Sequence, residues 1–125
     1  MLIFGHKDIE SKKLYSIFSI SDIETTPPNS IILIDSLDID ILKFSMKNSV
    51  SVAIEVKTVR EAILAENLDV KYIISDIELA SKIQKIADNY LYDSKILAWI
   101  ENDSELEKIA EFQIDGAIFR NGSFQ

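Results

Sequence analysis

Short apolar runs alternate with segments of helical periodicity over most of the chain from residue 31 onward. Five of the runs have the length and the β-branched content that are typical of buried strands. These runs are Ile31–Ile34, Val50–Val56, Tyr72–Ile74, Ile96–Ile100 and Ala117–Phe119. Because they are continuously apolar rather than alternating, we expect strands that are covered on both faces, as in a parallel sheet.

Four helices are predicted between these strands. The first extends from about Asp38 to Lys47, and the second follows Thr58, which forms a capping-box pattern with Glu61. A second capping-box pattern, Ser104 with Glu107, starts the fourth helix. The third carries the clearest amphipathic stripe, made by Leu79, Ile83, Ile86, Ala87 and Tyr90. The alternation predicts an α/β fold, a five-stranded parallel sheet with helices on both faces.

Residues 1–30 form an N-terminal extension to the predicted body, residues 31–125. The pair Pro27-Pro28 breaks the chain between the two parts, because proline lacks an N–H and restricts the residue before it. Leu2–Phe4 predicts a strand, and Leu14–Ile20 predicts either a second strand or a helix. We expect a hairpin of these two segments that packs on the body or on a partner.

Composition narrows the class of protein. The chain has 125 residues, 47% of them hydrophobic and 27% charged, which suits one soluble domain with its own core. The absence of cysteine excludes disulfide scaffolds, thiol catalysis and cysteine zinc sites. A net charge of −8 argues against binding to nucleic acid or to anionic membranes. With neither a signal peptide nor an apolar run of the roughly 20 residues that a membrane span needs, a cytoplasmic location is expected.

Charged residues lie at or near the carboxyl end of each of the five predicted strands. Four are acids and one is a base: Asp35, Glu55, Asp76, Glu101 and Arg120. Ligands of open parallel sheets bind at the carboxyl ends of the strands, where such residues meet. Carboxylate oxygens there are suited to a hard cation such as Mg²⁺, whereas a purely structural explanation is that strands end where solvent begins. Both explanations stay open.

Residues 31–120 resemble the response-regulator receiver domain. The resemblance rests on residues 31–35 (Ile-Ile-Leu-Ile-Asp), 72–77 (Tyr-Ile-Ile-Ser-Asp-Ile) and 115–119 (Asp-Gly-Ala-Ile-Phe). It implies a flavodoxin-like sheet with the strand order 2-1-3-4-5. It also implies that Asp35 is a metal ligand and that Asp76 accepts a phosphoryl group with Mg²⁺ bound.

Several positions depart from the receiver pattern. The second acid after the first strand is Ser36, and the position of the hydroxyl residue after the fourth strand falls at Ile100 or Glu101. The family's lysine is Arg120, which can hold a phosphate with a planar fork rather than a point charge, and its following proline is Asn121. These departures predict that a phosphorylation switch does not operate.

Only six residues follow the fifth predicted strand, so the last helix of a receiver is expected to be missing. Its loss would leave part of one sheet face bare, and a soluble monomer does not tolerate a large exposed apolar face. Either residues 1–30 or a second copy of the chain is expected to cover that face. The sequence therefore predicts a homodimer.

Four aromatic side chains outside the predicted acidic site have simpler structural explanations. His6 is expected to be an ordinary surface residue, and Trp99 a core or interface residue. Tyr90 and Tyr92 end the third helix, where they pack or serve as interface anchors.

Three functions remain. The chain has no Walker loop, no dinucleotide fingerprint and no catalytic triad. We therefore expect a non-enzymatic, receiver-like regulatory or protein-interaction module that is not phosphorylated and needs no cofactor. The first alternative is half of a β/α barrel that binds or acts on a phosphorylated metabolite as an oligomer. The second is an atypical receiver that accepts a phosphoryl group with Mg²⁺.

Overall fold

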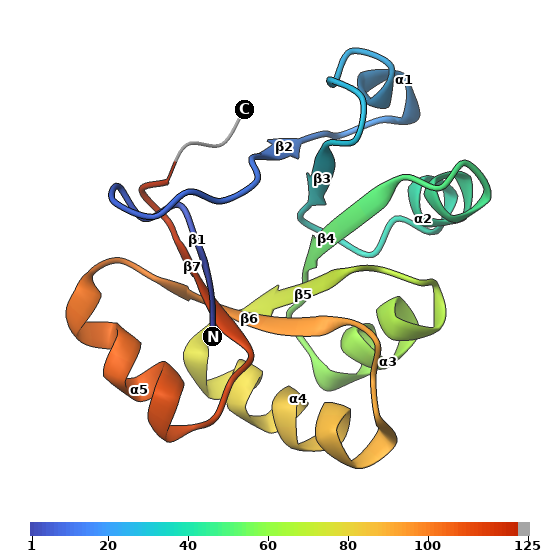
Figure 1. Cartoon of the computed structure of the whole chain (residues 1–125). Helices are drawn as coiled ribbons and strands as arrows, with labels where there is room; N and C mark the ends of the chain where they lie inside the picture. Colours follow the sequence, from blue (N-terminus) through green and yellow to red (C-terminus); the bar gives the residue numbers. More distant parts are fainter. Residues whose placement is uncertain (123–125) are drawn as a thin grey trace.

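The structure, a computed structural model, describes residues 1–122 and arranges them around one parallel sheet (Figure 1). The strand order in the sheet is β1-β7-β6-β5-β4-β3-β2, and every neighbouring pair is parallel. Apart from β1, which pairs with the last strand β7, the strands follow their order in the chain. The strands are β1 Leu2–Phe4, β2 Leu14–Ser16, β3 Ile31–Ile34, β4 Ser51–Glu55, β5 Tyr72–Ser75, β6 Lys95–Ile100 and β7 Gly116–Phe119.

Five helices connect the strands in the described part of the chain. They are α1 Ile20–Ile23, α2 Ile39–Lys47, α3 Val59–Asn67, α4 Ile77–Tyr90 and α5 Leu106–Glu111. The N-terminal cap at Thr58 is confirmed, since its hydroxyl accepts the Glu61 N–H at 3.1 Å, but the second bond of the predicted box is shifted by one residue, because the Glu61 carboxylate accepts the N–H of Lys57 at 2.6 Å. At Ser104 the predicted box is wrong, because this residue lies inside a 3-10 turn, Asp103–Glu105, that precedes α5. None of the helices in residues 1–122 is long and apolar enough to cross a membrane.

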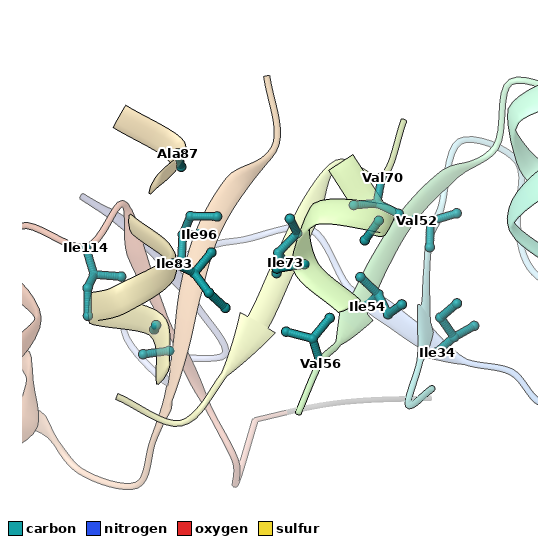
Figure 2. Close-up of a cluster of buried hydrophobic side chains, with 14 of the residues drawn as sticks. Ile34, Val52, Ile54, Val56, Val70, Ile73, Ile83, Ala87, Ile96 and Ile114 are labelled. Atoms are coloured by element: carbon teal, nitrogen blue, oxygen red, sulfur yellow. The ribbon is translucent and has the colours of Figure 1, made fainter. Parts of the chain in front are cut away.

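All the helices lie on the outer face of the sheet, which curls around its other face (Figure 1). The outer core is packed between strands and helices, and Figure 2 shows Ile73 and Ile96 of the sheet in this cluster with Ile83 of α4. The inner core consists of strand side chains that face one another: Phe4, Leu14, Ile31, Leu33, Ala53, Tyr72, Ile74, Leu97, Trp99 and Ile118.

The contact between Phe4 and Tyr72 measures the curl. Their rings meet edge to face with centroids 5.1 Å apart, although β1 and β5 are separated in the sheet by β7 and β6. In a flat sheet three strand spacings alone would hold the two strands about 14 Å apart. The two ends of the sheet are therefore brought toward each other, and the inner face is filled by its own side chains.

The α/β class, the parallel sheet and the five predicted strands are confirmed, but three finer predictions about the sheet are wrong. The sheet has seven strands rather than five, and its helices cover one face rather than both. The 2-1-3-4-5 order is absent, because β3 pairs with β2 and β4 rather than with β5. The N-terminal hairpin is also absent, since β1 and β2 lie at opposite edges of the sheet.

The helixless face is buried by side chains of this chain. Inner residues such as Leu97 and Ile118 have no exposed surface, and Leu14 on the edge strand β2 is only 1% exposed. A flat sheet would need a second layer on this face, whereas in the curled sheet the inner side chains of the strands cover one another. This face therefore gives no reason for a homodimer, and the homodimer stays a prediction.

Candidate functional site

The sequence-predicted acids Asp35 and Asp76 follow strands that are not neighbours. Asp35 follows β3 and Asp76 follows β5, and β4 lies between these strands. The register, which sets Ile54 opposite both Ile34 and Ile73, places Asp76 about two residues farther along the strand direction. Two strand spacings and this offset put the two Cα atoms roughly 12 Å apart. In the 2-1-3-4-5 order the two strands would be adjacent, so the sequential order removes the geometry that the receiver resemblance implied.

Asp76 has a structural task at the start of α4. Its Oδ1 accepts the backbone N–H of Leu79 at 2.8 Å, which is the side-chain cap that the first turn of a helix needs. Its backbone carbonyl accepts the Ala80 N–H at 2.9 Å. Helix capping therefore explains why an aspartate follows β5, without any role in binding a metal or a phosphoryl group.

Glu55 points to the inner side of the sheet at the end of β4, in the same alternation as the buried Ala53. Its side chain is 19% exposed and forms an ion pair with the Lys57 ammonium group, which is 71% exposed. The pair lies at the rim of the sheet, where the carboxylate is partly buried and the ammonium group is in solvent. Glu55 is therefore neutralised locally and does not join the other rim acids.

Arg120 and Glu101 continue neighbouring strands beyond their last paired residues. The Arg120 N–H donates to the Ile100 carbonyl at 2.9 Å, which extends the β6–β7 ladder by one step. The guanidinium lies over the Trp99 ring, 4.8 Å from its centroid, whereas the Glu101 N–H donates to the Glu105 carboxylate at 3.1 Å. Trp99 itself is 9% exposed and belongs to the inner core, as one of its two expected roles required. Arg120 thus covers the top of the inner core with a cation–π contact.

His6 is a member of this rim that the sequence reasoning missed. Its side chain is only 12% exposed and contacts the Phe119 ring edge to face, with centroids 5.2 Å apart. Its Nε2 lies 3.0 Å from Oδ1 of Asp103, and its Nδ1 accepts the Asp8 N–H at 3.0 Å. The prediction of an ordinary surface residue is wrong, because two partners, one of them 97 positions away, hold the ring.

The partners of His6 determine its tautomer and its chemistry. A backbone N–H can only donate, so Nδ1 is the unprotonated nitrogen and Nε2 carries the hydrogen that Asp103 accepts. Neither nitrogen is left to take a proton from a ligand unless one of these bonds opens. The ring therefore joins the loop after β1 to the turn after β6.

Two hollows adjoin His6. One, of about 440 Å³, lies between the loops that follow β1, β6 and β7 and is lined by residues 5–7 and 101–103 with Phe119 and Asn121. The other, also of about 440 Å³, lies inside the segment that links β1 to β2. Within residues 1–122, no three histidine, aspartate or glutamate side chains lie close enough together to hold a metal ion.

An apolar groove between α3 and α4 is a second surface feature that the predicted site did not include. It is lined by Ile63, Glu66, Asn67, Ile86, Tyr90 and Tyr92. Tyr90 is 77% exposed, and Leu91, which follows it, is 84% exposed. Burial, the Glu66 carboxylate and Tyr90 together raise the pKa of the Tyr92 hydroxyl above its ordinary value.

Comparison with models of known protein families and with curated proteins finds no match for this chain.

Proposed function

We propose that the protein is a non-enzymatic interaction module that binds a protein partner through the groove between α3 and α4. The observation that carries this proposal is Leu91, which combines two unfavourable properties. It is a large apolar side chain 84% exposed to solvent, and its φ of 55° lies in the left-handed region. Neither property helps the chain to fold.

The backbone at Leu91 makes leucine a poor choice for stability. Helices commonly end in a left-handed residue, for which glycine or asparagine is preferred because a Cβ atom is strained there. The other non-glycine residues with positive φ among residues 1–122 are polar: Asn29, Ser49, Asp69 and Gln113. An apolar residue that breaks both rules is better explained by a contact outside the fold.

The surroundings of Leu91 suit a protein partner. Tyr90, which precedes Leu91 in the chain and lines the groove, is 77% exposed, and Ile63, which lines the groove from α3, is 42% exposed. Tyrosine is a frequent anchor of protein interfaces, as it offers a large rigid ring and a hydroxyl. The groove therefore combines isoleucine and tyrosine side chains with the polar side chains of Glu66 and Asn67.

Charge indicates the chemistry of the partner. Glu66 lines the groove, and its carboxylate is fixed there by the N–H groups of Asp93 at 3.2 Å and Ser94 at 3.1 Å. The whole chain carries a net charge of −8. An apolar partner segment flanked by lysine or arginine would match both features, whereas a second copy of this chain would bring the same negative charge.

A non-enzymatic role is supported by what the rim residues already do. Asp76 caps a helix, Glu55 pairs with Lys57, Arg120 stacks on Trp99 and both nitrogens of His6 are engaged. These four side chains are engaged in contacts within the fold. The resemblance to receivers stays a prediction that the strand order does not favour, and the sequential order favours the β/α-barrel alternative for the scaffold alone.

Photo-cross-linking in the cells that make the protein tests the proposal. A photoreactive phenylalanine analogue replaces Tyr90, and in a matched control it replaces Phe112, which is 49% exposed and lies just beyond α5. We expect one adduct from position 90 that disappears when Leu91→Gly is added and that does not form from position 112. No adduct at position 90, or the same adducts at both positions, would refute the proposal. An adduct of twice the chain's mass would assign the groove to a homodimer instead.

A further inference from the structure

The segment between β1 and β2 encloses a hollow whose wall has three lysines and two acids. Residues 5–13 form most of its wall, Phe4 and Leu14 lie at its base, and residues 121–122 complete it beside β7. Lys7, Lys12 and Lys13 all line it, so that 3 of the 13 lysines and arginines of the chain lie within seven consecutive residues. With Asp8 and Glu10 the charged side chains of the wall sum to +1, in a protein with a net charge of −8.

The three lysines are not used by the fold. Within residues 1–122 none of them forms an ion pair, although the acids Asp8 and Glu10 line the same hollow. All three are exposed. Holding like charges together at neighbouring positions costs free energy unless an anion offsets it.

Other residues hold the wall in its shape. The Gly5 N–H donates to the Ser11 hydroxyl at 3.2 Å, and the Asp8 N–H donates to His6, which is itself joined to Asp103. Gly5 adopts a φ of 81°, and a Cβ atom built on Gly122 would come within 2.8 Å of its Cα. The two glycines therefore allow the turns after β1 and β7 to touch. The hollow is preformed, and its lysines are free to face a ligand.

The place and the donors of the hollow fit a phosphate group. It opens at the carboxyl ends of β1 and β7, the end of a parallel sheet at which ligands bind, and phosphate sites of β/α barrels are frequently built from the loops after their last strands. Since the Ser11 oxygen accepts the Gly5 N–H, its own hydrogen can be donated to a ligand, as can the amide of Asn121. A volume of about 440 Å³ suits a small molecule.

We infer that this hollow binds the phosphate of a small phosphorylated molecule, with Lys7, Lys12 and Lys13 offsetting its charge. A compact dianion can lie against the three lysines of the hollow, whereas a long polyanion such as a nucleic acid would also meet the acidic remainder of the surface. The site is separate from the groove between α3 and α4, so it stands or falls independently of the proposed partner surface.

Titration at low, constant ionic strength tests this site. Inorganic phosphate and glycerol 3-phosphate are added to the full chain while amide chemical shifts are followed. The test variant is Lys12→Gln with Lys13→Gln. Its matched control, Lys82→Gln with Lys85→Gln, removes the same charge from two exposed lysines of α4.

Shifts should centre on residues 5–13 and 121–122, with tighter binding of glycerol 3-phosphate than of phosphate. The test pair should weaken binding about tenfold and the control pair less than about twofold. The amide spectrum reports whether each variant is folded, and Lys7→Gln replaces the test pair if that pair is not. Equal weakening by both pairs, shifts centred elsewhere, or no shift at saturating phosphate would overturn the inference.

Discussion

Replacing Leu91 by glycine should stabilise the fold while it removes the proposed contact. The left-handed backbone at this position costs a residue with a Cβ atom roughly 1–2 kcal/mol, and glycine avoids that strain. Against this gain, glycine loses about 0.5–1 kcal/mol more conformational entropy on folding. Because Leu91 is already 84% exposed, the apolar burial lost with its side chain is worth only about 0.3 kcal/mol.

The balance is an increase of about 0.5 kcal/mol in the free energy of unfolding, or about 2 °C in Tm for a chain of this size. Urea denaturation followed by circular dichroism measures it, with Gln113→Gly as the matched control, since Gln113 is also exposed and has a φ of 56°. The control should be stabilised similarly and should keep the cross-link from position 90. A loss of about 1 kcal/mol or more in Leu91→Gly would show that leucine serves the fold, and the role proposed for Leu91 would be refuted.

Three further predictions concern the frame of the sheet. Gly116→Ala should lower the free energy of unfolding by about 2–3 kcal/mol in urea titrations, because a Cβ atom there would lie 2.5 Å from the Leu2 carbonyl oxygen; a neutral effect would contradict the tight packing of β1 on β7. Asp76→Ala should cost about 1 kcal/mol by the same assay and Asp76→Asn much less, since asparagine also caps helices; an equal loss in both would point to a role for the charge. The pKa of the Asp22 carboxyl group is lowered, and the largest cause is the hydrogen bond that it accepts from the Phe18 N–H. Burial opposes this shift, and hydrogen bonds from Ser19 add to it. The carboxyl carbon chemical shift of Asp22 should therefore titrate below the ordinary aspartate range. The stability that this carboxylate adds should be present above its unfolded pKa and should be lost as the pH falls through its folded pKa. A titration in the ordinary range would contradict the hydrogen bond from Phe18.

The curl of the sheet explains how a chain of this length covers both faces of seven strands with helices on one. Phe4 from one edge strand reaches Tyr72, and Leu14 from the other edge strand is buried in the same inner core. The edge strands β1 and β2 are each three residues long, which limits the unpaired backbone that they offer to other chains.

Local structure could be predicted from the sequence because its causes are local. The apolar runs that became β3 to β7, the helix α4 and the cap at Thr58 depend on residues within a few positions of one another. The predicted stripe of α4 is only partly correct, because Ile83 and Ala87 are buried whereas Tyr90 is 77% exposed. The charge of −8 and the absence of cysteine likewise narrowed the chemistry, since both are properties of the composition alone. The same local pattern identified the acids at the carboxyl ends of the strands. It did not predict the distance between Asp35 and Asp76, because that distance depends on the strand order.

Strand order, the curl of the sheet, the partners of His6 and the exposure of Leu91 were decided only by the tertiary structure. A strand that is apolar on both sides has the same sequence whether helices cover its second face or the sheet covers that face itself. For this reason the runs at Ile31–Ile34 and Tyr72–Ser75 fit an open sheet with two helical layers as well as they fit the curled one. The His6–Asp103 contact joins residues 97 positions apart, and the exposure of Leu91 depends on how α4 ends and on what lies beside it. Such contacts have no signature in the local sequence. The pattern of apolar and polar residues therefore leaves open which distant segments of the chain lie side by side.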